Sequence, residues 1–370
     1  MKLHTVSHIA DIKPYPPGKP LDELEREYGI RNPIKLASNE NPWGPSPRAV
    51  EAVKGALGGL HRYPDGSCYY LTRALADRLE CHPEEIVVGN GSNELIEFLV
   101  KAFVQTDDEV ISSFPSFLMY QKFVQIRGGK NIVIPLREMT HDLGAVTAAV
   151  TRKTRLIFLD NPNNPCATAI PPASFAAFLQ TLPEDLIVVL DEAYVDFMPA
   201  EKRIDLLSLI RQHQAIPAVV GLRTFSKAYG LGGLRVGYAI AHRKICSLLH
   251  RVRQPFNISV PGQVGALAAL EDEEHYRHTL DATRAGLDRL RREVEKLGCR
   301  AYPSCTNFFL IDVRGDAAAL YEAMLHRGVI IRSMQAYGFA TFIRVTVGTD
   351  EENDRFLKAL SSCLKELHYV

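Results

Sequence analysis

One lysine, Lys227, has neighbours suited to amine chemistry. It lies in the glycine-rich stretch 223–238 (Arg-Thr-Phe-Ser-Lys-Ala-Tyr-Gly-Leu-Gly-Gly-Leu-Arg-Val-Gly-Tyr), directly after the apolar run 218–222 and eight residues before Arg235. A loop lysine is usually a solvated charge. Burial or a second cation lowers the pKa of a lysine, and the neutral amine then forms Schiff bases. Arg235 is a candidate for that cation, or for the ligand of an anion beside the lysine.

Polar side chains follow three of the apolar runs in this chain. The segment 160–165 (Asp-Asn-Pro-Asn-Asn-Pro), the segment 191–194 (Asp-Glu-Ala-Tyr) and the pair Ser226 and Lys227 each come after such a run. Parallel strands bring their carboxyl ends to one edge of a sheet, where ligands bind. A carboxylate, an amide, a phenol and an amine would meet there. Each alone has an ordinary explanation as a cap, a turn or a packed side chain.

Together these groups match the needs of pyridoxal 5′-phosphate chemistry. A carboxylate keeps the pyridine nitrogen protonated, hydrogen-bond donors hold the ring oxygen, and a lysine forms the covalent link. A glycine-rich turn at 89–93 (Gly-Asn-Gly-Ser-Asn) lies between a short apolar run and a helical segment. The N–H groups at such a helix start bind phosphate, although Gly-x-Gly also occurs in ordinary capped turns. The sequence therefore predicts a pyridoxal phosphate site.

Strands and helices must alternate to position these residues. The apolar runs are continuous, which is typical of strands buried on both faces. They occupy residues 110–111, 131–134, 155–159, 186–190, 218–222 and 238–241. Helical or turn segments separate most of them, so we predict a mainly parallel α/β sheet, with residues 237–241 as an antiparallel neighbour.

The pattern changes after Pro261. Residues 263–297 predict one or two long helices that end at Gly298, and apolar runs alternate with two further helices as far as residue 367. We therefore divide the chain into three parts. They are an N-terminal arm with a short helix (1–35), a large cofactor-binding domain (36–262) and a small α/β C-terminal domain (263–370).

Composition limits the classes of function. The 370 residues are 46% hydrophobic and 23% charged, with a formal net charge of +0. Bulk charge thus gives no indication of nucleic-acid or membrane binding. The seven cysteines contain no C-x-x-C pair of the kind seen in zinc or redox sites, and their odd, dispersed set suits a reducing compartment. We expect a cytoplasmic protein with no metal and no membrane span.

On these motifs the chain resembles the fold-type I aminotransferases, and among them most closely the histidinol-phosphate aminotransferases. The resemblance covers essentially the whole chain. The lysine motif at 226–237 is the most specific element, and the segments 15–19 (Tyr-Pro-Pro-Gly-Lys) and 39–42 (Asn-Glu-Asn-Pro) narrow the choice. The resemblance implies a seven-stranded, mainly parallel sheet between helices, a smaller C-terminal domain, pyridoxal 5′-phosphate as cofactor, and a homodimer with shared active sites.

The resemblance also implies roles for individual residues. Lys227 forms the link to the cofactor and moves a proton, Asp191 pairs with the pyridinium nitrogen, and Tyr194 bonds the ring oxygen. The cofactor-binding set is Gly91, Ser92, Asn93, Phe117, Asn164, Asp191, Tyr194, Ser226, Lys227, Arg235 and Tyr63. The substrate-binding set is Tyr15, Asn41, Arg332 and Arg344.

Three of these positions carry more specific expectations. Phe117 stands where many relatives have tyrosine, and it keeps the ring stacking without the hydroxyl. Tyr63 is expected to reach the phosphate in the neighbouring subunit. The family's Asn-Pro-x-Asn-Pro-Thr-Gly motif has Cys166 and Ala167 in place of Thr-Gly. That departure lies beyond Asn164, so cofactor binding should be kept, whereas the local turn could differ.

Four functions remain open from the sequence. The leading one is transamination between L-histidinol phosphate and 2-oxoglutarate, which gives imidazole acetol phosphate and L-glutamate in histidine biosynthesis. An aromatic amino-acid aminotransferase shares the cofactor site, and an amino-acid-phosphate decarboxylase of the same fold uses the same lysine. The fourth is a regulator that binds the cofactor without turnover. Such regulators carry a DNA-binding head, and we find neither a spare N-terminal domain nor a basic excess for one.

Overall fold

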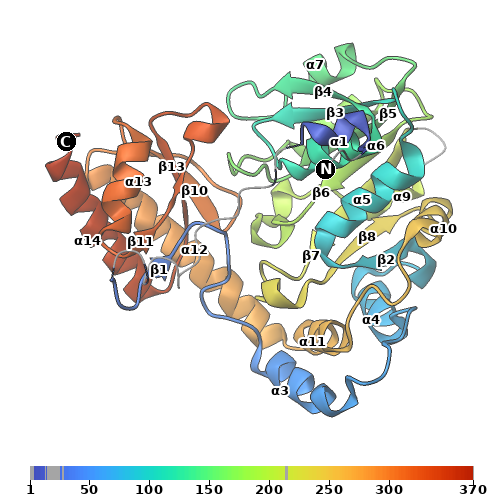
Figure 1. Cartoon of the computed structure of the whole chain (residues 1–370), viewed down its shortest axis with the longest axis horizontal. Coiled ribbons are helices and arrows are strands. Elements are labelled where there is room, and N and C mark those ends of the chain that lie inside the picture. The colour runs from blue at the N-terminus through green and yellow to red at the C-terminus, as the bar shows by residue number, and fades with distance from the viewer. Residues whose placement is uncertain (1–3, 13, 15–25, 27–28, 213–215, 370) are drawn as a thin grey trace.

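A seven-stranded sheet forms the centre of the molecule (Figure 1). The computed structural model describes the chain except for residues 1–3, 13, 15–25, 27–28, 213–215 and 370. Each pair of neighbouring strands is parallel except where β8 pairs with β2 and β7. The strand order is β2 (Ile86–Gly89), β8 (Gly237–Ala241), β7 (Ala218–Thr224), β6 (Ile187–Asp191), β5 (Thr154–Asp160), β3 (Glu109–Phe114) and β4 (Lys130–Pro135). The predicted mainly parallel sheet and its antiparallel strand are confirmed.

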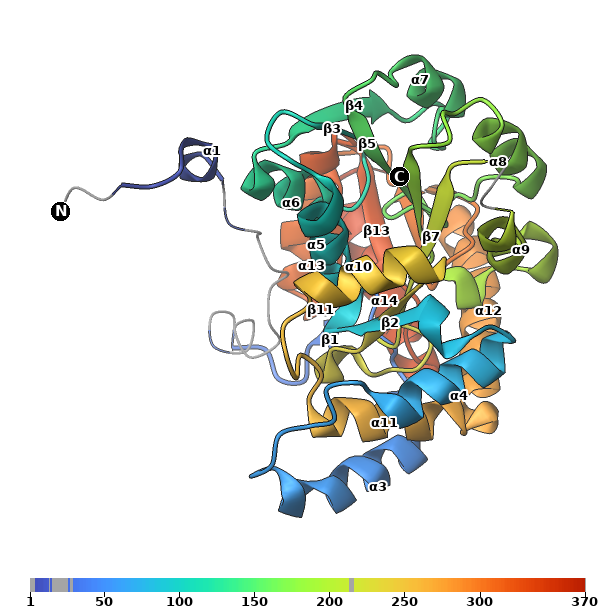
Figure 2. The ribbon, with the colours of Figure 1, turned by 90° about the vertical axis from the view of Figure 1, so that its right-hand side faces the viewer.

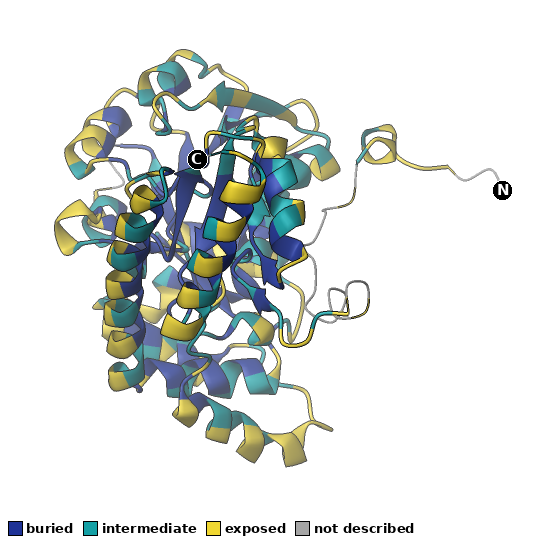
Figure 3. Cartoon of the chain, turned by 90° about the vertical axis from the view of Figure 1, so that its left-hand side faces the viewer, coloured by how far each residue is buried: buried dark blue, intermediate teal, exposed yellow. Residues whose placement is uncertain are grey.

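Helices cover both faces of this sheet (Figures 1 and 2). In β5, Ile157 and Leu159 pack into one apolar core and Leu156 and Phe158 into another, which explains the continuous apolar run in the sequence. One core includes residues of α3 (Pro47–Ala56), α4 (Tyr69–Leu79), α7 (Leu143–Ala148), α8 (Pro172–Leu179), α9 (Leu206–Arg211) and α11 (Val260–Leu270). The other includes residues of α5 (Gly91–Phe103), α6 (Met119–Arg127) and α10 (Arg243–Val252). Figure 3 shows the resulting pattern of buried strands and outward-facing, exposed helix surfaces.

A second, antiparallel sheet lies in the C-terminal part. Its order is β12 (Arg332–Ser333), β13 (Phe342–Thr346), β10 (Phe308–Asp312) and β9 (Arg300–Ala301). The helices α13 (Ala317–Leu325) and α14 (Asp350–Glu366) pack with this sheet in one core. The long helix α12 (Glu273–Lys296) begins next to α11 and runs into this core (Figure 1). It ends before Gly298, whose φ of 82° is the left-handed conformation expected of a C-terminal cap.

Part of the N-terminal segment packs against the C-terminal core. The short strand β1 (Ile34–Lys35) pairs in parallel with β11 (Val329–Ile330), and Ile34 and Leu36 are buried in the C-terminal core. The predicted domain boundary at residue 35 therefore falls between residues that pack together, and α11 spans the other predicted boundary. Upstream, a short helix α1 (Ser7–Ala10) contacts α6 through a hydrogen bond between His8 Nε2 and the Ile126 carbonyl, 3.1 Å long. The short helix predicted for the arm, at residues 21–29, lies mostly outside the described residues. No helix in the described ranges is long and apolar enough to cross a membrane.

Candidate active site

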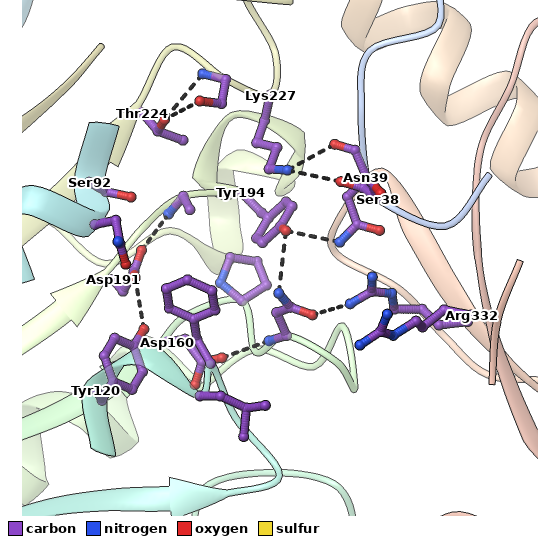
Figure 4. Close-up of a pocket in the computed structure, with 18 of the residues that line it drawn as sticks. Ser38, Asn39, Ser92, Tyr120, Asp160, Asp191, Tyr194, Thr224, Lys227 and Arg332 are labelled. Carbon is purple, nitrogen blue, oxygen red and sulfur yellow. Dashed lines mark hydrogen bonds between the residues drawn. The ribbon is translucent and has the colours of Figure 1, made fainter. Parts of the chain in front are cut away.

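A cavity of about 260 Å³ opens at the carboxyl ends of β5, β6 and β7 (Figure 4). The large sheet supplies one wall, which includes Lys227, Asp191 and Tyr194 and which we call the cofactor side. The small sheet supplies Arg332 and Arg344, which we call the substrate side. The predicted site residues that line the cavity are Ser92, Asn93, Phe117, Asn164, Asp191, Tyr194, Ser226, Lys227, Arg235, Arg332 and Arg344.

Lys227 lies three residues beyond the end of β7 and lines the cavity. Its Nζ donates to the carbonyl oxygens of Ser38 at 3.3 Å and Asn39 at 3.1 Å, both of them neutral acceptors. Burial lowers the pKa of Lys227 to about 8, and the positive charge of Arg344 is the next largest cause. Arg235 also lowers this pKa but ranks behind Arg344. The second cation expected from the sequence is therefore chiefly Arg344, which the small sheet supplies.

Asp191 is the last residue of β6, and its side chain is buried. Its carboxylate accepts a hydrogen bond from the Tyr120 hydroxyl at 2.7 Å and from the Ala193 N–H at 3.1 Å. Burial raises the pKa of Asp191 to about 7. Among the described residues no Lys, Arg or His side chain forms an ion pair with Asp191. A buried carboxylate without a cation is costly, so this position suits a ligand that brings a cationic N–H group.

The Tyr194 hydroxyl lies between two amides. Its oxygen accepts from Asn39 Nδ2 at 2.9 Å and, more weakly, from Asn164 Nδ2 at 3.5 Å. Burial raises the pKa of Tyr194 to about 12, so the phenol keeps its proton at neutral pH. Because both amides donate to the phenol oxygen, the hydroxyl hydrogen is left to point at an acceptor in the cavity.

Backbone N–H groups and a guanidinium form an anion cradle at the start of α5. Gly91 has a φ of 74°, and a Cβ there would lie 2.3 Å from Arg235 Nη2. A Cβ on Gly237 would lie 2.5 Å from the backbone nitrogen of Ser92. Arg235 Nη1 also donates to Ser226 Oγ at 3.2 Å. Gly237 is thus required by close packing against backbone, and Gly91 is favoured by its left-handed φ. The cradle combines helix N–H groups, hydroxyls and a cation, as phosphate sites do.

The substrate side is built on a pair of facing arginines. Arg344 on β13 and Arg332 on β12 are direct partners in the antiparallel register. Arg344 is buried, and its guanidinium donates to Asn164 Oδ1 at 2.5 Å and to the Ala37 carbonyl at 2.8 Å. Like charges opposite one another destabilise a strand pair, so this arrangement favours a ligand with negative charge.

Of the predicted site residues that the structure describes, three do not line this cavity: Tyr63, Asn41 and Gly91. Tyr63 is 83% exposed and stacks on Phe256, with ring centroids 5.0 Å apart. Asn41 donates to the carbonyl oxygen of Ala228 at 3.2 Å, so it contacts the residue that follows Lys227. Gly91 is the first residue of α5, directly before Ser92, which does line the cavity. Tyr15 lies outside the described residues.

The structure adds residues to which no role was assigned from the sequence. Tyr120, Ser38, Asn39 and Asp160 all line the cavity. Tyr120 follows Phe117 by three residues, and the two rings meet edge-on at 5.6 Å. This spacing was the available signal for Tyr120. Asp160 carried the strand-end signal of the segment 160–165, but no role was assigned to it. Ser38 and Asn39 carried no such signal, because their places depend on contacts with distant segments.

The turn that departs from the family motif places a residue other than glycine in the left-handed conformation. Ala167 has a φ of 61°, in the left-handed region that costs a residue other than glycine about 1–2 kcal/mol. The backbone N–H of Cys166 donates to Asn163 Oδ1 at 2.9 Å, and that of Ala167 donates to the Asn163 carbonyl at 2.8 Å. Burial raises the pKa of the Cys166 thiol to about 12, so the thiol remains protonated.

Comparisons with known proteins agree with this site. The family model described as aminotransferase class I and II matches residues 31–360. The chain belongs to the class I and II aminotransferases.

Within that class the chain is similar to several histidinol-phosphate aminotransferases. The protein of that name from Desulfotalea psychrophila is 60% identical over 370 residues, which is 100% of this chain and 98% of the relative. The one from Moorella thermoacetica is 44% identical over 356 residues, 96% of this chain and 92% of the relative. The crystal structure of histidinol-phosphate aminotransferase from Sinorhizobium meliloti in complex with pyridoxal-5′-phosphate has a TM-score of 0.91 at 29% identity and covers 99% of each chain.

The residues of the cavity fit the cofactor of this class. Class I and II aminotransferases use pyridoxal 5′-phosphate, so the cofactor predicted from the sequence is confirmed. Asp191 lacks a cation, Lys227 offers an amine, and the cradle at α5 offers phosphate donors. Asn93 Oδ1 is buried without a hydrogen-bond partner, which leaves a further polar atom for a ligand. Within the described ranges, no group of three or more His, Cys, Asp or Glu side chains could hold a metal ion.

Proposed function

We propose that this protein transfers the amino group of L-histidinol phosphate to 2-oxoglutarate with pyridoxal 5′-phosphate, giving imidazole acetol phosphate and L-glutamate in histidine biosynthesis. One observation carries the proposal: Lys227, with a pKa near 8, and the cation-free carboxylate Asp191 face the same cavity as two arginines. The substrate is assigned from the relatives, which share up to 60% identity over the whole chain.

The cofactor side supplies the chemistry. When bound, pyridoxal 5′-phosphate is an electron sink that stabilises negative charge on the substrate carbon bearing the nitrogen. Asp191 would hold the proton on the ring nitrogen, and that proton would in turn supply the charge that Asp191 lacks. The N–H groups of Ser92 and Asn93 would hold the phosphate together with Arg235. Phe117 would cover one face of the ring.

Lys227 would act as the acid and base of the reaction. A pKa near 8 lets its amine take a proton from the substrate carbon and return one at neutral pH, which is the efficient range for such a group. Burial and Arg344 cause the lowered pKa, so the substrate side tunes the base. Tyr194 and Asn164 would hold the ring oxygen through the hydroxyl hydrogen and an amide.

The substrate side would bind the anionic ends of both substrates. Guanidinium groups bind carboxylate and phosphate through paired charge-assisted hydrogen bonds. Arg344, deeper in the cavity wall, would take the carboxylate of glutamate next to its amino group. Arg332, with Tyr15, would take the phosphate of histidinol phosphate. One pair of arginines thus serves a phosphate donor and a dicarboxylate in turn.

The active unit would be a homodimer with shared sites. Tyr63 is 83% exposed and its ring stacks on the exposed Phe256, an arrangement that suits contact with another subunit. In the dimer, Tyr63 of the partner subunit would reach the cofactor phosphate. Subunits with Lys227→Ala and subunits with Tyr63→Phe should therefore restore activity when refolded together, because one site of the mixed dimer is intact. A fully active monomer in light scattering would contradict the shared site.

A half-reaction spectrum tests the substrate. L-Histidinol phosphate without 2-oxoglutarate should convert the absorbance of the cofactor-loaded protein to that of the aminated cofactor, and glutamate should do the same. Phenylalanine and unphosphorylated histidinol serve as matched controls and should react more slowly. Faster reaction with phenylalanine would favour an aromatic aminotransferase. Carbon dioxide release from an amino-acid phosphate would favour the decarboxylase.

A further inference from the structure

A second buried carboxylate, Asp160, lies beside Asp191 in the cavity wall. Asp160 ends β5 and is the direct register partner of Asp191 on β6. It is only 4% exposed, and in the described part of the chain no lysine or arginine pairs with it. Asp160 nevertheless differs from Asp191, because several hydrogen-bond donors surround its two oxygens.

The donors to Asp160 come from three separate loops. On Oδ1, Ser116 Oγ donates at 2.6 Å, Asn163 Nδ2 at 3.1 Å and His141 Nε2 approaches to 3.2 Å. On Oδ2, the backbone N–H of Asn164 donates at 2.7 Å. We call Asp160 with these four residues the Asp160 cluster. The four donors converge on one buried carboxylate, so the carboxylate holds the three loops together.

His141 is oriented for this task. It is 6% exposed, and its Nε2 faces two oxygen acceptors, the carboxylate of Asp160 and the Asp160 backbone carbonyl at 2.9 Å. This nitrogen therefore carries a hydrogen. The other nitrogen, Nδ1, is 2.7 Å from the Ser113 hydroxyl on β3. The ring thus ties Asp160 to the neighbouring strand.

The bond from Asp160 to Asn164 reaches both sides of the active site. Asn164 Oδ1 accepts from Arg344 at 2.5 Å, and Asn164 Nδ2 donates toward the Tyr194 hydroxyl at 3.5 Å (Figure 4). Because Oδ2 of Asp160 holds the backbone of Asn164, it also limits where the Asn164 amide lies. A shift of that amide would move its contacts with Arg344 and Tyr194.

This chain has a reason to need such a support. On the far side of the turn, Cys166 and Ala167 replace the threonine and glycine of the family motif. A buried, protonated thiol is a weak hydrogen-bond donor compared with a hydroxyl, and Ala167 has a left-handed φ of 61°. The turn is therefore supported from the Asp160 side by charge-assisted hydrogen bonds, which are stronger than neutral ones.

We infer that Asp160 is a positioning residue that sets Asn164, and through Asn164 the guanidinium of Arg344, for binding the substrate carboxylate. The inference rests on the proposed carboxylate role of Arg344. It does not depend on histidinol phosphate being the amino donor.

Asp160→Asn is the variant that tests this role, because it keeps the size of the side chain. One of its terminal groups becomes an NH2 donor. If that group replaces Oδ2 it faces the Asn164 N–H, and if it replaces Oδ1 it faces Asn163 Nδ2 and His141 Nε2. Either orientation leaves donors facing each other.

The measurement is the binding of maleate, an unreactive dicarboxylate. Its binding is detected through the change that it causes in the absorbance of the cofactor. Asp160→Asn should raise the maleate Kd about tenfold, as expected for loss of a charged hydrogen bond. Cofactor retention on dilution should change little. In glutamate turnover, KM should rise more than kcat falls.

A double-mutant cycle decides whether Asp160 acts through Asn164. If it does, Asn164→Ala alone and Asn164→Ala with Asp160→Asn should bind maleate equally weakly. If Asp160→Asn weakens maleate binding further in the Asn164→Ala background, the inference is overturned. Asp160 then acts by another path, such as its charge near Asp191. An unchanged maleate Kd in Asp160→Asn would also overturn the inference.

Asp272→Asn is the matched control for lost stability. Asp272 is likewise buried, accepts from the His275 N–H at 3.2 Å, and does not line the cavity. Its variant should lower the thermal midpoint without raising the maleate Kd. If both variants weaken maleate binding in proportion to their loss of stability, the effect of Asp160 is structural and the inference is wrong. Failure of wild-type protein to react with histidinol phosphate would instead count against the proposed function alone.

Discussion

The two sides of the cavity are built in different ways. On the cofactor side, consecutive parallel strands of one sheet present Asp191 and Lys227, whose pKa values are shifted to about 7 and about 8. On the substrate side, two arginines from a second sheet face each other, and Arg344 is held by neutral carbonyl and amide oxygens. The cofactor side therefore holds groups poised to exchange or share a proton, whereas the substrate side holds permanent charge.

This difference separates two kinds of mutational effect. Changes on the cofactor side should slow the reaction of every substrate, because they remove the shared chemistry. Changes on the substrate side should depend on which anionic end the substrate carries. Substitutions on each side should therefore differ in how far their effect depends on the substrate.

Lys227→Ala should have the largest effect. It removes both the covalent link to the cofactor and the acid-base group, and we expect turnover to fall by about 10⁴-fold or more with all substrates. Borohydride reduction of the wild-type protein should fix the cofactor on the peptide that contains Lys227, as read by peptide mass mapping. A tag on any other lysine would refute the assignment.

Asp191→Asn should come next. Without the carboxylate the ring nitrogen loses the partner of its proton, and turnover should fall by about 10²–10⁴-fold for glutamate and histidinol phosphate alike. The cofactor should still bind through its phosphate, which equilibrium dialysis would show. Near wild-type turnover would mean that Asp191 does not hold the ring nitrogen.

Asp191→Asn should also change how the stability of the cofactor-free protein depends on pH. Folding raises the pKa of Asp191 from 3.8 to about 7. The folded state therefore binds the extra proton between those values. This group's stabilisation is complete below pH 3.8 and is lost as the pH rises through about 7. Asp191→Asn should remove that loss. In urea titrations, the unfolding free energy of wild type should therefore fall relative to that of the variant from pH 4 to pH 7, by roughly 1.4 kcal/mol per pH unit.

The contrast also explains what the sequence could predict. Lys227, Asp191 and Asn164 each lie within a few residues of a strand end, and the strands are continuous apolar runs, so local pattern was enough to bring them together. Tyr120 and His141 could not be placed in the same way. Their contacts with Asp191 and Asp160 depend on the strand order β6-β5-β3 and on the loops that cross between these strands.

Long-range pairing also limited the prediction of the rest of the chain. The facing of Arg332 and Arg344 is a matter of strand register, which a one-residue slip would reverse. Ile34 and Leu36 join the C-terminal core because β1 pairs with β11, almost a whole chain length away. No local pattern near residue 35 indicates that β1 pairs with β11. The domain boundary at residue 35 stays a prediction.

Arg344→Ala should have the largest effect on the substrate side. We expect a loss of about 2–4 kcal/mol in the glutamate half-reaction, the scale for truncating one member of a buried charged pair. Arg344 also lowers the pKa of Lys227, so that pKa should move upward in the variant. Single-turnover rates against pH would show both changes. A loss of the same size for an amine that lacks a carboxylate would contradict the carboxylate role.

Arg332→Ala should have a smaller and more selective effect. Arg332 is only half-buried, so solvent weakens its interaction, and we expect a loss of about 1–2 kcal/mol for histidinol phosphate. Phenylalanine, which has no phosphate, should lose less. The ratio of kcat/KM for the two donors is the measurement, and unphosphorylated histidinol is the control donor. An unchanged ratio would show that Arg332 does not bind the phosphate.

Tyr120→Phe should have the smallest effect. It tests whether a small change on the cofactor side still affects both substrates equally. The Tyr120 ring stacks on Phe158 at 4.8 Å and meets Phe117 edge-on at 5.6 Å, and phenylalanine keeps both contacts. Only the hydroxyl donated to Asp191 at 2.7 Å is lost. That hydrogen bond lowers the pKa of Asp191, so its loss should raise this pKa further above 7 in cofactor-free protein. With cofactor bound, the activation free energy of turnover should rise by about 1 kcal/mol for glutamate and histidinol phosphate equally, because the hydrogen bond serves a group that both half-reactions use. A loss confined to one substrate would show that Tyr120 reads the substrate, and the division between cofactor side and substrate side would fail at that residue.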